Sequence, residues 1–166
     1  MRKMMLRLTQ QPKWKLVLLI LGGIFIILQF IRPDYNNGEL KGENDIYHLV
    51  DVPDDVNSIL TKACFDCHSN HTEYPWYTQI QPIGWWINNH VEDGNEELNF
   101  SEFASMKTKG QLHKLHECVE MLEGGEMPLD SYTWIHKDAK LTPEEKEKVI
   151  AWAKKSQDEI LSRSNK

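Results

Sequence analysis

Two cysteines and a histidine lie within five consecutive residues of this 166-residue chain, Cys64-Phe65-Asp66-Cys67-His68. The spacing C-x-x-C-H is typical of c-type haem attachment. On a helix, positions i, i+3 and i+4 share one face, so both sulfurs can meet the two vinyl edges of one porphyrin while the imidazole reaches the iron. The motif therefore predicts thioether bonds from Cys64 and Cys67 and an iron ligand in His68.

Two other functions of the motif compete with haem attachment. A Cys64–Cys67 disulfide of the thioredoxin type needs a preceding strand and a β-α-β context, and the sequence predicts neither. A zinc site from Cys64, Cys67, His68 and His71 has suitable ligand types, but the adjacent Cys67 and His68 would strain tetrahedral geometry. Haem attachment is the interpretation that these residues favour.

A second iron ligand is expected at Met127. Iron held by His and Met has a raised reduction potential, as in cytochromes c. Residues 124–126 and Pro128 predict an extended loop around Met127, from which a thioether can close over the open haem face. Met106 and Met121 are expected to pack within a helix. Four histidines are alternative ligands or ordinary polar residues: His90, His113, His116 and His136.

Apolar periodicity predicts helices around the motif. One helix is expected from Pro53 into Cys64, a second from Ser101 to Leu122 with Cys118 as a buried apolar residue, and a third from Thr142, where a capping box begins. No alternating strand pattern of useful length occurs. The predicted fold is all-α: a small cytochrome c-like helical domain that encloses one haem, preceded by a single transmembrane helix.

The stretch between residues 71 and 99 is rich in aromatic residues and broken by proline and glycine. Short helical turns and loops are expected there. Its large aromatic side chains are expected to build the core around the haem. They are Tyr74, Trp76, Trp85 and Trp86.

The first 32 residues predict a membrane anchor. Residues 16–31 are apolar apart from Gln29, and Trp14 and the flanking basic side chains suit an interface. No small-residue cleavage site follows, so the segment is expected to stay attached. The basic residues before it predict a cytoplasmic N-terminus and an exported remainder.

Charge separates the anchor from the rest of the chain. Six of the 19 Lys and Arg and none of the 25 Asp and Glu precede residue 33, which leaves 13 basic against 25 acidic residues, a net charge of −12. Such an acidic domain repels nucleic acid. The predicted organisation is a basic end and anchor at 1–32, a linker at 33–52 and a haem-binding domain at 53–162.

Beyond the motif, the chain resembles the small haem-binding domain family of bacterial membrane-anchored c-type cytochromes. The likeness covers roughly residues 24 to 155. It is carried by Cys64 to Asn70, Tyr74-Pro75-Trp76-Tyr77, Ile80, Pro82, Trp85, His90-Val91, Gly94, Leu98 to Ser101, Met127-Pro128, Tyr132, His136, Ala139, Leu141 and Trp152.

The resemblance implies haem binding at Cys64, Cys67 and His68, an amino-terminal anchor, and an axial role for Met127 at the family's Met-Pro position. Asn95 stands where the family is expected to have Arg, which puts a contact to the haem propionates or to a partner in doubt, and Phe103 replaces an expected Trp.

These features predict an electron carrier with one haem c on the periplasmic side of a bacterial inner membrane, which exchanges electrons with membrane or periplasmic redox partners. An enzyme is not required, because six-coordination leaves no open site and no acid–base constellation lies beside the motif. The alternatives are a five-coordinate, peroxidase-like haem enzyme or gas sensor, and a haem-binding accessory protein.

Overall fold

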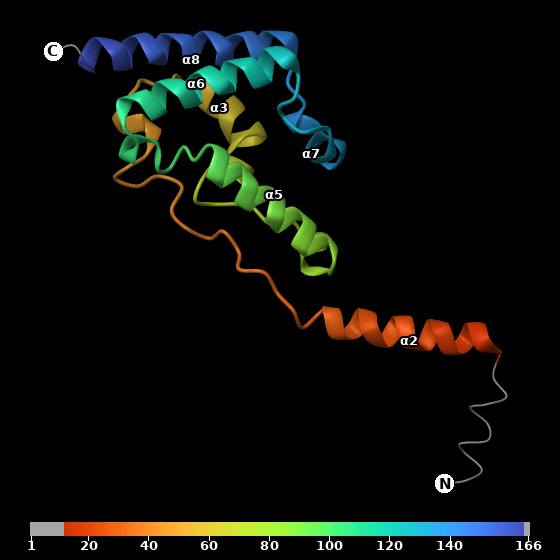
Figure 1. The fold of residues 1–166 in the computed structure, drawn as a ribbon. Helices are drawn as coiled ribbons and strands as arrows, with labels where there is room; N and C mark the ends of the chain where they lie inside the picture. The colour runs from red at the N-terminus through yellow and green to blue at the C-terminus, as the bar shows by residue number, and fades with distance from the viewer. Residues whose placement is uncertain (1–11, 165–166) are drawn as a thin grey trace. The chain divides into compact units, whose positions relative to one another are not determined.

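The structure is a computed structural model that describes residues 12–164, and its regular elements are helices (Figure 1). In these residues no strand forms, and Asn37 and His71 make an isolated antiparallel bridge. The all-α prediction is confirmed. The α-helices are α2 (Lys13–Leu28), α3 (Asp54–Ala63), α4 (Phe65–His68), α5 (Ile83–Glu97), α6 (Thr108–Gly124), α7 (Asp130–Ile135) and α8 (Pro143–Ser164), joined by short 3-10 turns at Ile46–His48, Trp76–Gln79, Phe103–Ser105 and Lys137–Ala139.

The chain divides into two compact units. One comprises the chain up to Asp34 together with Tyr74–Asn88, and the other comprises Tyr35–Glu73 and the chain from Asn89 onward. The C-x-x-C-H motif and Met127 both belong to the second unit. The boundaries predicted at residues 32 and 52 stay predictions.

Helix α2 is too short for the expected membrane span. Its 16 residues extend roughly 24 Å at the helical rise, against a hydrocarbon core of about 30 Å, because the helix ends at Leu28 with Gln29 as its C-cap. Among residues 12–164, no helix combines the length and the apolarity needed to cross a membrane. The predicted transmembrane helix is therefore not supported, and residues 1–11 of the predicted basic end lie outside the described residues.

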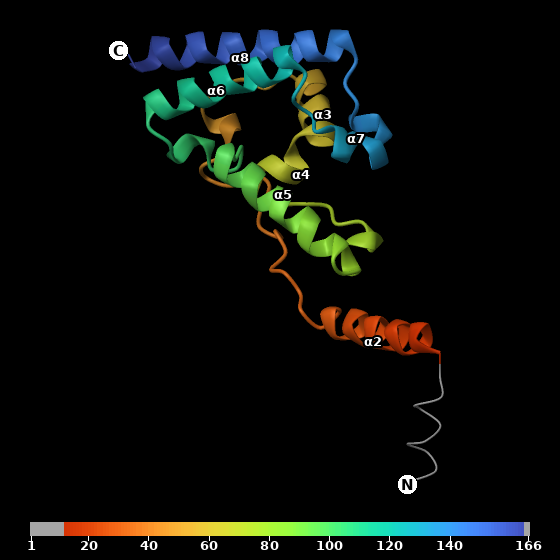
Figure 2. The same cartoon turned by 45° about the vertical axis from the view of Figure 1, so that its right-hand side comes forward.

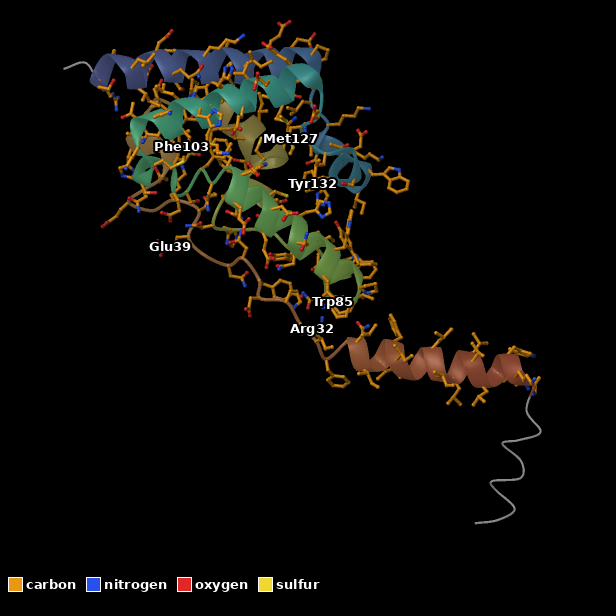
Figure 3. The ribbon with its side chains drawn as sticks, viewed as in Figure 1. Arg32, Glu39, Trp85, Phe103, Met127 and Tyr132 are labelled. Atoms are coloured by element: carbon orange, nitrogen blue, oxygen red, sulfur yellow. The ribbon has the colours of Figure 1, made fainter. Side chains whose placement is uncertain are left out.

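The aromatic segment does not supply the core that the sequence predicts. Within the first unit, Trp85 donates its ring N–H to the carbonyl of Ile31 at 2.9 Å, and Arg32 donates to the carbonyl of Gln79 (Figure 3 labels Trp85 and Arg32). Trp76 and Trp86 are 76% and 50% exposed. These two rings therefore cover no core in the described residues.

The core of the second unit forms around two long antiparallel helices. Helices α6 and α8 lie side by side in both views of the ribbon, and α3 packs against α8 (Figures 1 and 2). Between them Leu60, Leu115 and Val149 are at most 1% exposed. Phe100 contacts two further aromatic rings, those of Phe65 and Trp152, at centroid distances of 5.5 and 6.5 Å. Apolar burial of this kind is the main term that stabilises a small domain.

Helix α8 begins with the predicted capping box. The Glu145 amide donates to the Thr142 hydroxyl at 3.2 Å, and the Thr142 amide donates to the Glu145 carboxylate at 2.9 Å. Lys62, from α3, also donates to Glu145. The bond from Lys62, followed by that from the Thr142 amide, lowers the pKa of Glu145 below its ordinary 4.5. The stability that the Glu145 carboxylate contributes is thus present above pH 4.5 and is lost as the pH falls through the lowered pKa.

Replacing Thr142 with alanine is expected to lower the free energy of unfolding by about 1 kcal/mol, because one N-terminal amide of α8 loses its acceptor. Urea unfolding at neutral pH measures the difference. Thr142→Ser keeps the hydroxyl and serves as the matched control. Equal stability of the alanine and serine variants would contradict a capping role.

Two helices differ from their predicted extent. Helix α6 starts at Thr108, seven residues after the predicted cap, because the Ser101 hydroxyl donates instead to the Leu40 carbonyl at 2.7 Å. Helix α5 runs without a break through Gly84 and Gly94, where the sequence predicts short turns and loops. Gly94 lies against the C-x-x-C-H motif, and this contact explains why the position has no side chain.

Candidate functional site

The C-x-x-C-H motif lies at a break between two helices. Helix α3 ends at Ala63, Cys64 has φ −127° and ψ −45°, and α4 comprises Phe65–His68. The Cys64 carbonyl accepts from the amides of Cys67 and His68 at 3.1 and 2.9 Å. Helix α3 thus runs into Cys64 as predicted. Although the helix breaks there, the i+3 and i+4 bonds keep the helical spacing of the three side chains.

One cavity of about 340 Å³ brings the predicted ligands together. Its volume lies within the range of about 300–1,000 Å³ common for small-molecule sites. Cys64, Cys67, His68 and Met127 all line it. The remaining wall is largely apolar and includes Ala63, Leu98, Phe100, Leu122, Leu129, Leu141 and Val149.

The imidazole of His68 is fixed by two backbone carbonyls. Its Nδ1 lies 2.8 Å from the Gly94 oxygen and 2.9 Å from the Leu98 oxygen. Carbonyl oxygens only accept, so Nδ1 carries the proton and Nε2 keeps its lone pair. Burial lowers the pKa of His68, which favours the neutral ring. His68 therefore presents a neutral, oriented nitrogen of the kind that binds iron.

None of the three cysteines forms a disulfide, and all three line the cavity. Burial raises the pKa of Cys64 well above its ordinary value, and burial followed by the charge of Asp66 raises the pKa of Cys67 to about 11. Burial likewise raises the pKa of Cys118 to about 11. The thiols are thus protonated at neutral pH. Cys118 is partly buried, whereas the sequence predicts a buried residue, and its place in the same cavity is a finding that its helical position did not indicate.

Gly94 allows α5 to approach the motif closely. A Cβ atom at this position would lie 2.6 Å from the Cys67 oxygen and 3.0 Å from the Cys67 Cβ. Backbone atoms cannot yield at such distances without movement of a helix. The missing side chain therefore permits the carbonyls of Gly94 and Leu98 to reach His68.

Gly94→Ala is expected to push α5 off the motif, with a loss of about 1–3 kcal/mol in the free energy of unfolding and a fall in haem incorporation. Gly110→Ala, also in a helix, is the matched control. Its added Cβ would meet Met106 at an ordinary 3.8 Å. Chemical denaturation and the ratio of haem absorbance to protein measure both effects. Wild-type haem content in Gly94→Ala would show that the close approach is unimportant.

Met127 lies on the loop after α6, as predicted (Figure 3). Helix α6 is ended by Gly125, whose left-handed φ of 74° suits glycine, and the Met127 amide donates to the Met121 carbonyl at 3.3 Å. Met121, expected to pack within the helix, also lines the cavity. The structure thus offers two thioethers to the site, one on a loop and one in the last turns of α6.

A hydrogen bond joins the motif to the segment that follows Met127. The hydroxyl of Tyr132, in α7, donates to the Asp66 carboxylate at 2.7 Å, and the Tyr132 ring stacks on His136 at a centroid distance of 4.3 Å and an angle of 7°. Burial, followed by the bond to Asp66, raises the pKa of Tyr132, so the hydroxyl remains a donor. Sequence reasoning did not find this pair, because the two residues are 66 positions apart.

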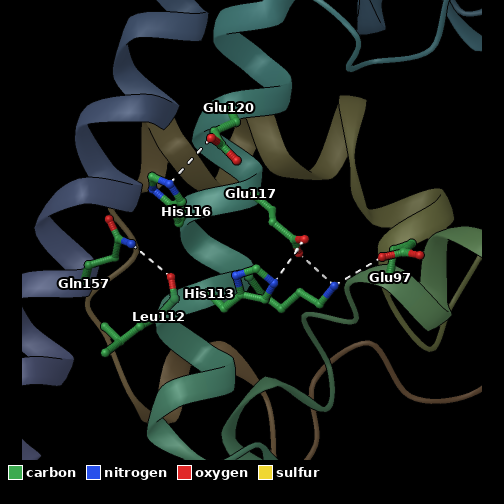
Figure 4. Close-up of polar contacts among 8 residues, drawn as sticks. Glu97, Leu112, His113, His116, Glu117, Glu120 and Gln157 are labelled. Carbon is green, nitrogen blue, oxygen red and sulfur yellow. Dashed lines mark hydrogen bonds and ion pairs between the residues drawn. The ribbon is translucent and has the colours of Figure 1, made fainter.

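Acidic and basic side chains that line the cavity pair with one another, and their contacts are drawn in Figure 4. Lys114, which lines the cavity, lies 2.8 Å from the Glu117 carboxylate and 3.2 Å from that of Glu97. Lys114 is the one lysine or arginine among the described residues of the lining. Its hydrogen bond to Glu117 raises the pKa of Lys114 and lowers that of Glu117. A cation lies at the cavity although Asn95 replaces the expected Arg.

The alternative histidine ligands differ in whether they line the cavity. His90 lines the cavity, whereas His113 and His116 lie on the outer face of α6, 64% and 61% exposed, where each faces a glutamate (Figure 4). His71 is a ligand in the zinc alternative, and its Nδ1 lies 3.2 Å from the Gly38 carbonyl oxygen. Across residues 12–164, no three His, Cys, Asp or Glu side chains are arranged to hold a metal ion.

Comparison with known proteins defines the class. Residues 23–155 match the haem-binding domain family, which covers well over half of the chain. The chain belongs to this haem-binding family. No curated protein and no solved structure matches it.

The residues of the cavity fit a haem. A planar apolar cofactor needs apolar walls, and its iron needs an oriented neutral imidazole, which His68 provides. Two thiols stand beside that imidazole at the spacing of the attachment motif. A haem cofactor is thus supported by the family and is compatible with the site.

Proposed function

We propose that the chain binds one haem c covalently through Cys64 and Cys67, ligates its iron with His68 and Met127, and transfers single electrons. The observation that carries the proposal is the meeting of two thiols, an oriented imidazole and a loop thioether in one apolar cavity. A bound haem would supply a one-electron couple there. The protein would supply the attachment, the ligands and a wall that excludes water.

Each residue has a defined task in this proposal. When each thiol adds to a vinyl group, sulfur bonds to one carbon and the proton goes to the other, so no oxidant is needed. The carbonyls of Gly94 and Leu98 hold the proton on Nδ1 of His68, which keeps Nε2 toward the iron. Met127 would complete six-coordination and leave no position for a substrate.

The location and partners of the domain belong to the same proposal. Thioether attachment takes place on the exported side of bacterial membranes, so we place the haem domain in the periplasm at the inner membrane. The acidic remainder of the chain, net −12, favours redox partners with basic surfaces and disfavours nucleic acid. Fractionation of cells that express the full chain tests the location.

The decisive experiment is a pyridine haemochrome spectrum of the full chain, expressed with a cytochrome c maturation system and then treated with acidified acetone. Haem c stays with the protein and shows the spectrum of two saturated vinyl groups. Haem that is extracted by the solvent, with Cys64 and Cys67 free to alkylate, would refute covalent attachment.

A second candidate function rests on His90, because this residue lines the cavity and could act on a ligand at an open iron. In a five-coordinate haem enzyme or gas sensor, carbon monoxide binds the reduced protein rapidly and completely. In the proposed electron carrier, Met127 blocks that position, and binding is slow or absent. Stopped-flow mixing with carbon monoxide separates the two.

A further inference from the structure

We infer that Tyr132 is a positioning residue for the sixth iron ligand: its bond to Asp66 holds the Met127 loop against the attachment motif. The inference rests on the proposed ligation by Met127 and deepens it. It concerns two residues that themselves give no ligand to the iron. It explains how a loop can present a ligand at a fixed place.

The segment that carries Met127 has few supports of its own. Gly125 leaves α6 in a left-handed conformation, and Pro128 has no amide proton to donate. Helix α7 has six residues, none of them buried. A helix of that length is not stable alone. One end of this segment is tied to α6, because the Met127 amide donates to the Met121 carbonyl at 3.3 Å, and contacts from elsewhere must hold its other end.

Tyr132 supplies such a contact at the motif itself. Its hydroxyl reaches Oδ2 of Asp66 at 2.7 Å, midway between Cys64 and His68 in the sequence. Asp66 is fixed in turn, because its Oδ1 accepts from the Glu73 amide at 3.1 Å and its carbonyl accepts from the Thr72 hydroxyl at 2.6 Å. The Asp66 carboxylate is therefore held in place by bonds that do not depend on Tyr132.

The ring of Tyr132 is oriented as well. It stacks on His136 and lines the cavity, only five residues after Met127. A hydrogen bond to a carboxylate is stronger than one between neutral groups. Loss of this bond should raise the fraction of molecules in which the Met127 loop lies away from the iron. The apparent affinity of a competing ligand rises in proportion to that fraction.

The test is imidazole binding to the ferric, haem-loaded full chain, followed at the absorbance band of about 695 nm that a Met-to-iron bond gives. Tyr132→Phe is expected to bind imidazole roughly 10-fold more tightly, with unchanged haem content. Tyr47→Phe is the matched control, because its hydroxyl donates to Asn57, outside the cavity lining. It should behave as the wild type.

Asp66→Ala removes the same bond from the other side and completes a double-mutant cycle. In that background Tyr132→Phe should have no further effect, because the bond is already absent. A purely structural role would lower stability without changing imidazole affinity. If the wild type shows the band and Tyr132→Phe binds imidazole like the wild type, the inference is wrong while the proposed ligation stands.

Failure of the proposed function looks different. A wild type without the band, which binds imidazole as readily as Met127→Ala, would refute ligation by Met127 and the positioning role together.

Discussion

Replacing both Cys64 and Cys67 with alanine is expected to abolish all haem that survives denaturation. In the proposed attachment the two sulfurs supply both thioether bonds, and no other thiol belongs to the motif. His68 and the apolar wall would remain, so the variant can still take up haem without a covalent bond. Haem staining on a denaturing gel, together with the mass of the intact polypeptide, measures the loss.

Cys118→Ala is the matched control for this experiment. Cys118 lines the same cavity and is partly buried, as Cys64 and Cys67 are. It lies outside the motif, so its replacement should leave covalent haem unchanged. If Cys118→Ala lost its covalent haem while the double variant was still stained, the proposed attachment through Cys64 and Cys67 would be wrong.

The end of α3 at the motif and the start of α8 were predictable because their signals are local. Thr142 and Glu145 are three residues apart, and their reciprocal bonds follow from that spacing alone. The loop at Met127 was predictable for the same reason, since Gly125 and Pro128 both act on the backbone next to it. Features that depend on neighbours in sequence need no knowledge of the fold.

The parts of the site that were missed depend on distant residues. Gly94 looked like a helix breaker, but its role comes from Cys67, which lies 27 positions earlier and 2.6 Å from the absent Cβ. The bond between Tyr132 and Asp66 also depends on tertiary structure, and so does the place of Cys118 in the cavity. Composition likewise suggested an aromatic core, yet Trp76 is 76% exposed. Residue type gives the preference for burial, and only packing decides it.

The second large effect is expected at Met127. Replacement with alanine should remove the band of about 695 nm from the oxidised protein and lower its reduction potential, because a Met ligand raises the potential of His-ligated iron. If the intact bond leaves about 1% of molecules open, its removal raises the apparent affinity for carbon monoxide about 100-fold. Covalent haem should be unchanged, since the attachment motif is untouched.

Met121→Ala is the matched control, because it tests whether the other thioether at the cavity is the iron ligand. Met121 presents the other thioether to the cavity, from the end of α6, and its amide and carbonyl groups remain in the alanine variant. Because Met121 is held by the helix, its replacement should keep the band and the slow binding of carbon monoxide. Loss of the band in Met121→Ala but not in Met127→Ala would transfer the ligand role to Met121. The Tyr132 bond would then have no ligand to position.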